Sequence, residues 1–66
     1  MRTETGSWTV KFKDETAPTE ERRFVTEQEA KKAAQNFGTT MRKRAYVYDL
    51  ERHLVGWQHD GKWHWD

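Results

Sequence analysis

The chain has 66 residues, with 12 basic side chains, 11 acidic side chains and no cysteine. A chain this short has room for one hydrophobic core, so residues 1–66 are expected to form a single domain. The absence of cysteine excludes disulfide bonds and thiolate zinc sites. The formal net charge of +1 is low for a strong polyanion binder. The charge is also uneven, because three basic and five acidic residues precede Arg22, and nine basic and six acidic residues lie from Arg22 onward.

No segment approaches the roughly 20 consecutive apolar residues that a membrane-spanning helix needs. The first residues, Met1 to Glu4, also lack the apolar region of a signal peptide. We therefore expect a cytoplasmic protein with no membrane partner.

The segment from Ser7 to Lys13 alternates apolar and polar residues. Trp8, Val10 and Phe12 share one face, which is typical of a strand that buries one side. The polar stretch from Asp14 to Glu20 contains the only proline of the chain and is predicted to be a loop.

A second, shorter strand is predicted after this loop, from Glu21 to Val25. The two strands would pair as a hairpin.

A helix is predicted from Glu27 to Phe37. Thr26 and Glu29 have the spacing of a capping box, in which each side chain accepts a hydrogen bond from a backbone N–H at the helix start. The apolar residues repeat at helical spacing and form one narrow stripe, which consists of Ala30, Ala33, Ala34 and Phe37.

Two further features define the ends of this helix. Val25 and Ala30 have the spacing of a hydrophobic staple, a contact that fixes how the chain enters the helix. Gly38 follows the last helical residue, where a glycine in the left-handed conformation commonly ends a helix.

The rest of the chain predicts further strands. Asp60-Gly61 is a strong signal for a two-residue hairpin turn, because both positions of such a turn need positive φ. The predicted segments are a basic connection over Thr39–Arg44, a strand over Ala45–Leu50, a turn over Glu51–His53, a strand over Leu54–His59 and a short final strand over Lys62–Trp65.

The element order is therefore β-β-α-β-β with a further short β at the end. This order predicts an α+β, two-layer sandwich in which one helix covers one face of a small, mainly antiparallel sheet. The chain holds more aromatic residues than one alanine-rich helix can cover.

Five of these aromatic residues are therefore candidate binding residues: Tyr46, Tyr48, Trp57, Trp63 and Trp65. Exposed rings beside cations are what single-stranded nucleic acid uses for base stacking, and Trp, Tyr and Arg also dominate protein-binding hot spots. Two alternatives stay open. The C-terminal hairpin completes the core, or the open sheet face is a contact between two copies of the chain.

Arg42, Lys43 and Arg44 are the candidate basic residues, since three consecutive cations can hold a phosphate or an acidic partner. Further cations lie at Lys11, Lys13, Arg22, Arg23 and Arg52, and only one of the neighbours Arg22 and Arg23 can share a face with them. The alternative is that these charges are solvated and balanced by nearby acids, as surface pairs usually are.

The sequence gives no signal for chemistry. His53, His59 and His64 match no familiar zinc spacing, and a two-residue turn would place His59 opposite Lys62 and His64 opposite Trp57. Ser7 is the only serine, and no glycine-rich phosphate loop is present. We expect no metal, no cofactor and no catalytic residue.

Two segments carry a resemblance to a known class of domain: Trp8-Thr9-Val10-Lys11-Phe12, and Phe24 to Ala30 leading into Ala33-Ala34. They are similar to the three-stranded-sheet DNA-binding domains of plant transcription factors and to the arm-binding regions of phage integrases. The similarity covers about the first half of the chain. Those domains place three strands before the helix and end there, so no site residue is transferred. The resemblance implies nucleic-acid binding only by analogy of fold.

The sequence as a whole predicts a small, non-enzymatic binding module. A protein-interaction domain, acting as an inhibitor or adaptor on a protein partner or on a second copy of itself, is the first hypothesis because the net charge is close to zero. The alternative is a DNA- or RNA-binding domain that stacks bases on Tyr and Trp and holds phosphates with Lys and Arg.

Overall fold

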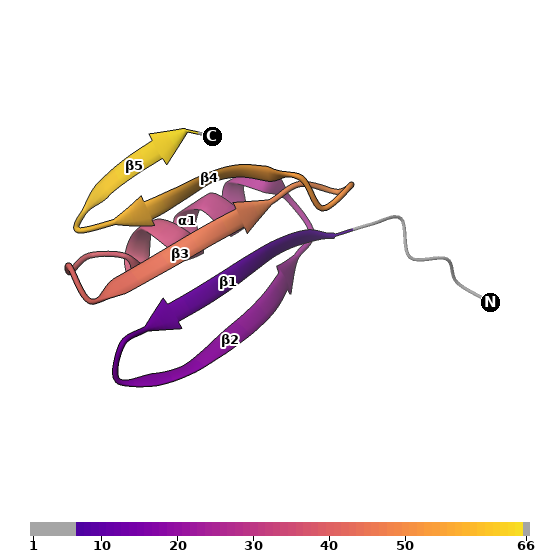
Figure 1. Ribbon diagram of the computed structural model, residues 1–66. Helices are drawn as coiled ribbons and strands as arrows, with labels where there is room; N and C mark the ends of the chain where they lie inside the picture. The colour runs from indigo at the N-terminus through magenta and orange to yellow at the C-terminus, as the bar shows by residue number, and fades with distance from the viewer. Residues whose placement is uncertain (1–6, 66) are drawn as a thin grey trace.

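The computed structural model of the protein describes residues 7–65, which form five strands and one helix (Figure 1). In chain order these are β1 (Trp8–Asp14), β2 (Ala17–Phe24), α1 (Glu27–Phe37), β3 (Lys43–Tyr48), β4 (Leu54–His59) and β5 (Lys62–Trp65). The strands build one antiparallel sheet in the order β2-β1-β3-β4-β5.

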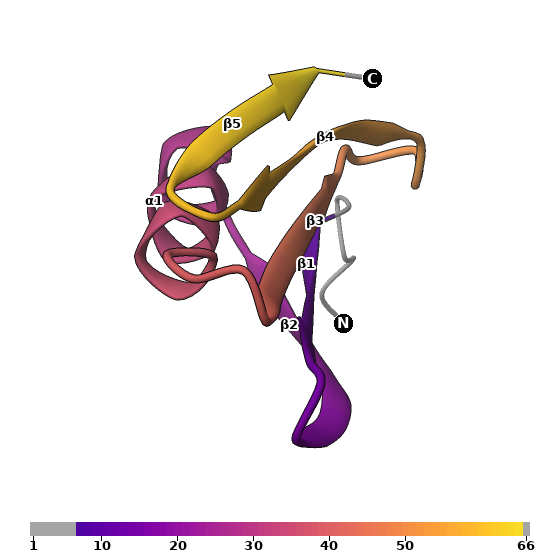
Figure 2. The same cartoon turned by 60° about the vertical axis from the view of Figure 1, so that its left-hand side comes forward.

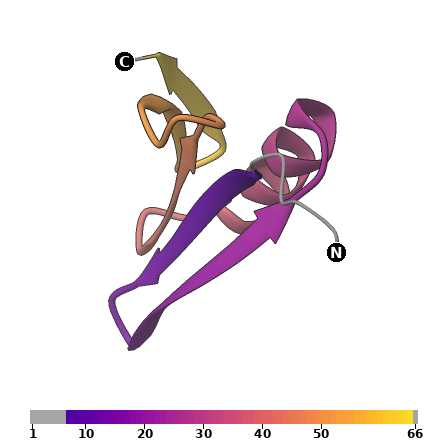
Figure 3. The ribbon, with the colours of Figure 1, turned by 90° about the vertical axis from the view of Figure 1, so that its right-hand side faces the viewer.

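Helix α1 lies along one face of this sheet (Figure 2). The predicted α+β two-layer sandwich is therefore confirmed, including the final short strand. The turn of the β1–β2 hairpin extends beyond the end of the helix (Figure 3). The sheet face opposite the helix is covered by no other element of residues 7–65.

The core lies between α1 and the two central strands β1 and β3. Its buried apolar residues are Val10, Phe12, Ala30, Ala34, Ala45 and Val47. The alanines of the helix let it lie close to the sheet, and the ring of Phe37 contacts that of Phe12 at a centroid distance of 4.9 Å. The alternation predicted for the first strand is thus confirmed on its core-facing side.

The helix begins and ends at the predicted residues, and its N-terminus is capped. The Thr26 hydroxyl accepts a hydrogen bond from the Glu29 N–H at 3.2 Å. The predicted hydrophobic staple is wrong, because Val25 is 83% exposed.

Gly38 does not have the predicted left-handed conformation, since its φ is −82°. A side chain there is excluded for another reason. A Cβ atom on Gly38 would lie 2.5 Å from the carbonyl oxygen of Gln58, so the chain leaving the helix can pass this close to β4 only with glycine.

The predicted loop over Asp14–Glu20 is wrong, because the turn consists only of Glu15 and Thr16 and β2 already begins at Ala17. Asp14 folds the turn by accepting hydrogen bonds at 2.9 Å from both the N–H and the hydroxyl of Thr16. Pro18 lies within β2. An edge strand tolerates proline, because no neighbouring strand needs an N–H donor on its outer side.

Strand β3 lies two residues earlier than predicted. Lys43 and Arg44 belong to the strand, and Asp49 begins the following turn. One carboxylate oxygen of Asp49 accepts hydrogen bonds from the N–H groups of Glu51 at 2.8 Å and His53 at 2.9 Å. These bonds end the strand before Leu50.

The β4–β5 hairpin agrees with the prediction. Asp60 and Gly61 have φ values of 53° and 74°, as a two-residue turn between twisted strands requires. His59 lies opposite Lys62 and Trp57 opposite His64.

Candidate functional site

The sheet face opposite the helix, which we call the open face, is defined by strand register. Residues directly opposite each other on neighbouring antiparallel strands share a face. Lys11 lies opposite Tyr46, which lies opposite Trp57, which lies opposite His64. The strand residues of the open face are Thr9, Lys11, Lys13, Glu21, Arg23, Arg44, Tyr46, Tyr48, Leu54, Trp57, His59, Lys62 and His64.

Three aromatic rings form a row across β3, β4 and β5. Tyr46 and Trp57 stack at a centroid distance of 6.1 Å, and Trp57 and His64 stack at 5.1 Å with ring planes 16° apart. Both faces of the Trp57 indole are therefore covered by neighbouring rings. All three side chains are half-buried, so the row remains partly accessible to solvent.

Two lysines of β1 cover the tyrosine rings of β3. The Lys13 ammonium lies 5.4 Å from the centroid of the Tyr46 ring, and the Lys11 ammonium lies 5.3 Å from that of Tyr48. A cation over an exposed ring contributes roughly 0.5–1 kcal/mol. Tyr46 and Tyr48 thus each have a ring face covered only by a long, flexible side chain.

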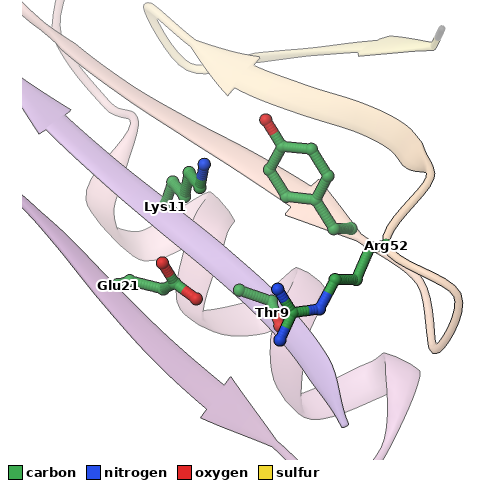
Figure 4. Close-up of a pocket in the computed structure, with 5 residues that line it drawn as sticks. Thr9, Lys11, Glu21 and Arg52 are labelled. Atoms are coloured by element: carbon green, nitrogen blue, oxygen red, sulfur yellow. The ribbon is translucent and has the colours of Figure 1, made fainter. Parts of the chain in front are cut away.

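A hollow of about 250 Å³ lies on the open face between β2, β1 and the β3–β4 turn (Figure 4). Thr9, Lys11, Glu21, Tyr48 and Arg52 line it. Arg52 extends from the turn toward Thr9, and its backbone has a φ of 67°. Two cations and two hydroxyl groups around one hollow can bind an anionic oxygen, and Glu21 is the one acidic group in it.

The charges of the molecule are divided between the two sides of the sheet. In the described strands, the open face carries five basic residues and one acidic residue, Glu21. Arg52 adds a sixth cation from the β3–β4 turn, which also contains the acidic residues Asp49 and Glu51. The helix and the strand positions on its side instead carry four residues of each sign, which are Asp14, Glu20, Glu27 and Glu29 against Arg22, Lys31, Lys32 and Lys43. The net charge of +1 therefore conceals a basic face.

The predicted cluster Arg42-Lys43-Arg44 is separated by the fold. Arg44 lies on the open face opposite Lys13, while the Lys43 ammonium lies over the Phe37 ring on the helix side, 5.3 Å from its centroid. Arg42 lies in the turn before β3. It lines a second hollow of about 310 Å³ together with Lys13, Arg44 and the acidic residues Asp14 and Glu15. Two of the three cations thus remain near the aromatic row.

The predicted aromatic residues are divided in the same way. Tyr46, Tyr48 and Trp57 lie on the open face, but Trp63 and Trp65 lie on the helix side, where their rings meet edge to face at 5.5 Å. Lys31 of α1 covers both rings, with its ammonium 5.8 Å and 4.9 Å from their centroids. The eight candidate residues therefore do not form one patch.

Trp63 is mainly a core residue. It packs against the buried cluster, and its indole passes so close to β4 that a Cβ atom on Gly56 would lie 2.7 Å from it. Its Nε1 and the Oε1 of Gln58 are buried without a hydrogen-bond partner among the described residues. Trp65 differs from Trp63 in being 67% exposed.

Two carboxylates hold the turns that position the basic side chains. Hydrogen bonds from the backbone N–H and the hydroxyl of Thr16 lower the pKa of Asp14. Those from the backbone N–H groups of His53 and Glu51 lower the pKa of Asp49. Both carboxylates are therefore ionised near neutral pH, and Arg52 lies in the turn that Asp49 closes.

Several residues of the open face were not among the predicted site residues, although the sequence contained the signal for some of them. Thr9, Lys11 and Lys13 are the polar half of the alternation in β1 and must face away from the core. His64 was expected opposite Trp57, and their stacking follows from that register.

No group of three His, Asp or Glu side chains within residues 7–65 is placed to hold a metal ion. No helix of that region is long and apolar enough to cross a membrane. Comparisons with protein-family models, curated proteins and solved structures find no match to this chain.

Proposed function

We propose that the protein is a non-enzymatic nucleic-acid-binding module that holds a single strand on its open face. The observation that carries this proposal is the segregation of charge: the strands of the open face carry five cations and one acid, and Arg52 adds a cation at the hollow. Phosphate groups supply most of the affinity for nucleic acid, and they are attracted by such a face whatever the net charge of the chain.

The contacts over the tyrosine rings support a single strand with unpaired bases. A base stacked on an aromatic side chain contributes roughly 1–3 kcal/mol, which exceeds the roughly 0.5–1 kcal/mol of an exposed cation over a ring. A base can therefore displace Lys11 from Tyr48 or Lys13 from Tyr46. Each displaced ammonium stays beside the same ring, where it can bind the phosphate of the stacked nucleotide.

Trp57 has a different role in this proposal. Its two ring faces are covered by Tyr46 and His64, so a base would have to break an aromatic pair to stack there. We infer that Trp57 fixes the orientation of the Tyr46 ring, and that bases stack on Tyr46 and Tyr48.

The proposal is tested with fluorescently labelled single-stranded oligonucleotides of about a dozen nucleotides at low salt, measured by anisotropy. Tyr48→Ala is expected to weaken binding roughly 5- to 150-fold, the equivalent of one lost base stack. Tyr48→Phe keeps the ring and loses only the hydroxyl group at the hollow, so it is the matched control and is expected to lose much less affinity than Tyr48→Ala. Circular dichroism checks that each variant is folded.

Two results would contradict the proposal. One is the absence of any anisotropy change at about 100 μM protein, which lies at the weak end of ordinary non-specific binding. The other is equal loss of binding in Tyr48→Ala and Tyr48→Phe, which would exclude stacking on this ring.

A second candidate function, docking on a protein partner, is supported by the pair Trp63 and Trp65 on the helix side. Trp65 is 67% exposed and lies beside Lys31 at the β5 edge. Large exposed aromatic residues are typical anchors of protein interfaces. If this surface carries the function, Trp65→Ala loses the protein partner in a pull-down and keeps the oligonucleotide affinity of the original protein unchanged.

A further inference from the structure

Strand β2 is one edge of the sheet, and no described segment pairs with its outer side (Figures 1 and 3). It is eight residues long, and every residue except Phe24 is exposed. Beyond it, Val25 is 83% exposed. The opposite edge, β5, has only four residues. A long unpaired edge offers its backbone N–H and C=O groups to another strand.

The charges along β2 are of both signs and follow a symmetric order: Glu20, Glu21, Arg22 and Arg23. Charged side chains and proline usually hinder pairing at a sheet edge, and β2 carries both, so its charges favour a second copy only where opposite signs face each other. In an antiparallel pair of identical strands, directly opposite residues share a face, so their residue numbers differ by an even number. The twofold axis that relates the two strands must therefore pass between the two copies of one residue. An axis through Arg22 places Glu21 opposite Arg23 of the second copy, twice, and places the two copies of Arg22 opposite each other at the axis. An axis through Glu21 places Glu20 opposite Arg22, also twice, and the two copies of Glu21 opposite each other.

We propose that two copies of this chain associate through β2, in antiparallel register about a twofold axis at Arg22. Opposite charges directly across an antiparallel pair attract each other, and the two Glu21–Arg23 pairs outnumber the one like-charge pair of Arg22 at the axis. This register places Thr19 opposite Val25 of the second copy, which covers the exposed valine. It also leaves Pro18, which has no N–H to donate, outside the paired segment.

The paired copies would form one continuous sheet of ten strands. Because opposite residues share a face, both helices lie on one side of it and both open faces lie on the other. This association does not depend on what the open face binds. It would place two copies of the basic aromatic surface side by side.

The test is a charge exchange between two variants, followed by sedimentation or light scattering. Arg22→Glu with Arg23→Glu makes this part of β2 entirely acidic, and Glu20→Arg with Glu21→Arg makes it entirely basic. Each variant alone is expected to be monomeric, because like charges then oppose each other. An equimolar mixture is expected to form a heterodimer. Variants that had merely lost their fold could not form this dimer on mixing.

The control is Lys32→Glu with Lys62→Glu, which changes the net charge as much as the acidic variant does but away from β2. It is expected to remain dimeric. If the original protein stays monomeric up to about 1 mM, the proposal is overturned, since a dissociation constant of about 1 mM is the weakest that counts as specific dimer formation here. It is also overturned by a mixture of the two exchanged variants that remains monomeric, or by an acidic variant that dimerises as well as the original protein.

Discussion

Single residues act in this small domain mainly by closing turns. Asp49 accepts two backbone hydrogen bonds with one carboxylate oxygen, and the Asp49 N–H itself donates to the carbonyl oxygen of His53 at 2.9 Å. Arg52 lies inside this turn with a φ of 67° and reaches the hollow on the open face. The carboxylate thus contributes both to the stability of the fold and to the position of a candidate phosphate-binding side chain.

Asp49→Asn tests this role through pH. Hydrogen bonds from the N–H groups of His53 and Glu51 lower the pKa of Asp49 in the folded state. The unfolded chain then binds more protons at acidic pH, so this contribution to stability is fully present above about pH 4 and is lost as pH falls through the folded pKa. We expect urea unfolding, followed by Trp fluorescence, to show the variant less stable than the original protein at pH 7, with a smaller difference near pH 3. An equal difference at both pH values would contradict the assignment.

The sequence contained information about single residues that the choice of candidate site residues did not use. The predicted register of the last hairpin already placed Trp57 opposite His64, so the alternation of a strand puts Trp63 and Trp65 on the other face. The lysines over Tyr46 and Tyr48 were not predictable in this way. Their placement depends on β1 pairing with β3, two strands that a helix separates in the sequence.

At the scale of elements, capping and helical spacing were sufficient to predict the helix, and the Asp60-Gly61 turn predicted the hairpin of β4 and β5. The beginning of β2 was not predicted, because Ala17-Pro18-Thr19 has the composition of a loop. It becomes a strand only because it lies at the edge of the sheet, where proline is tolerated. Strand order is a property of the whole fold, so an edge position cannot be inferred from the strand itself.

Thr26→Ala tests the helix start. The variant loses the hydrogen bond that the Thr26 hydroxyl accepts from the Glu29 N–H, and an N-cap of this type contributes roughly 0.5–2 kcal/mol. We expect the free energy of unfolding in urea to fall by that amount. Val25→Ala is the matched control in dilute protein, because Val25 is exposed and should matter little. A larger loss of stability in Val25→Ala than in Thr26→Ala would contradict this expectation and support the hydrophobic staple, which the structure lacks.

At the scale of the whole molecule, the net charge was the least informative number. It favoured a protein partner over nucleic acid, because +1 is low for a polyanion binder. The fold changes this ranking by placing balanced charges on the helix side and nearly unbalanced cations on the open face. Only the pairing of strands shows which charges share a surface.

The salt dependence of oligonucleotide binding measures how many of these cations contact phosphate. If Lys11, Lys13, Arg44 and Arg52 each hold one phosphate of a single strand, the logarithm of the binding constant should fall against the logarithm of salt concentration with a slope of about −3. Lys13→Ala combined with Arg44→Ala should reduce the magnitude of this slope by about 1.4, because each contact contributes about 0.7. The two side chains lie opposite each other on the open face, so one phosphate path can contact both.

Lys31→Ala combined with Lys32→Ala is the matched control, because it removes the same charge from helix α1. That variant should keep the slope of the original protein while lowering the net charge equally. If the two double variants instead reduce the slope by the same amount, binding follows net charge alone. The segregation of charge onto the open face would then have no part in it.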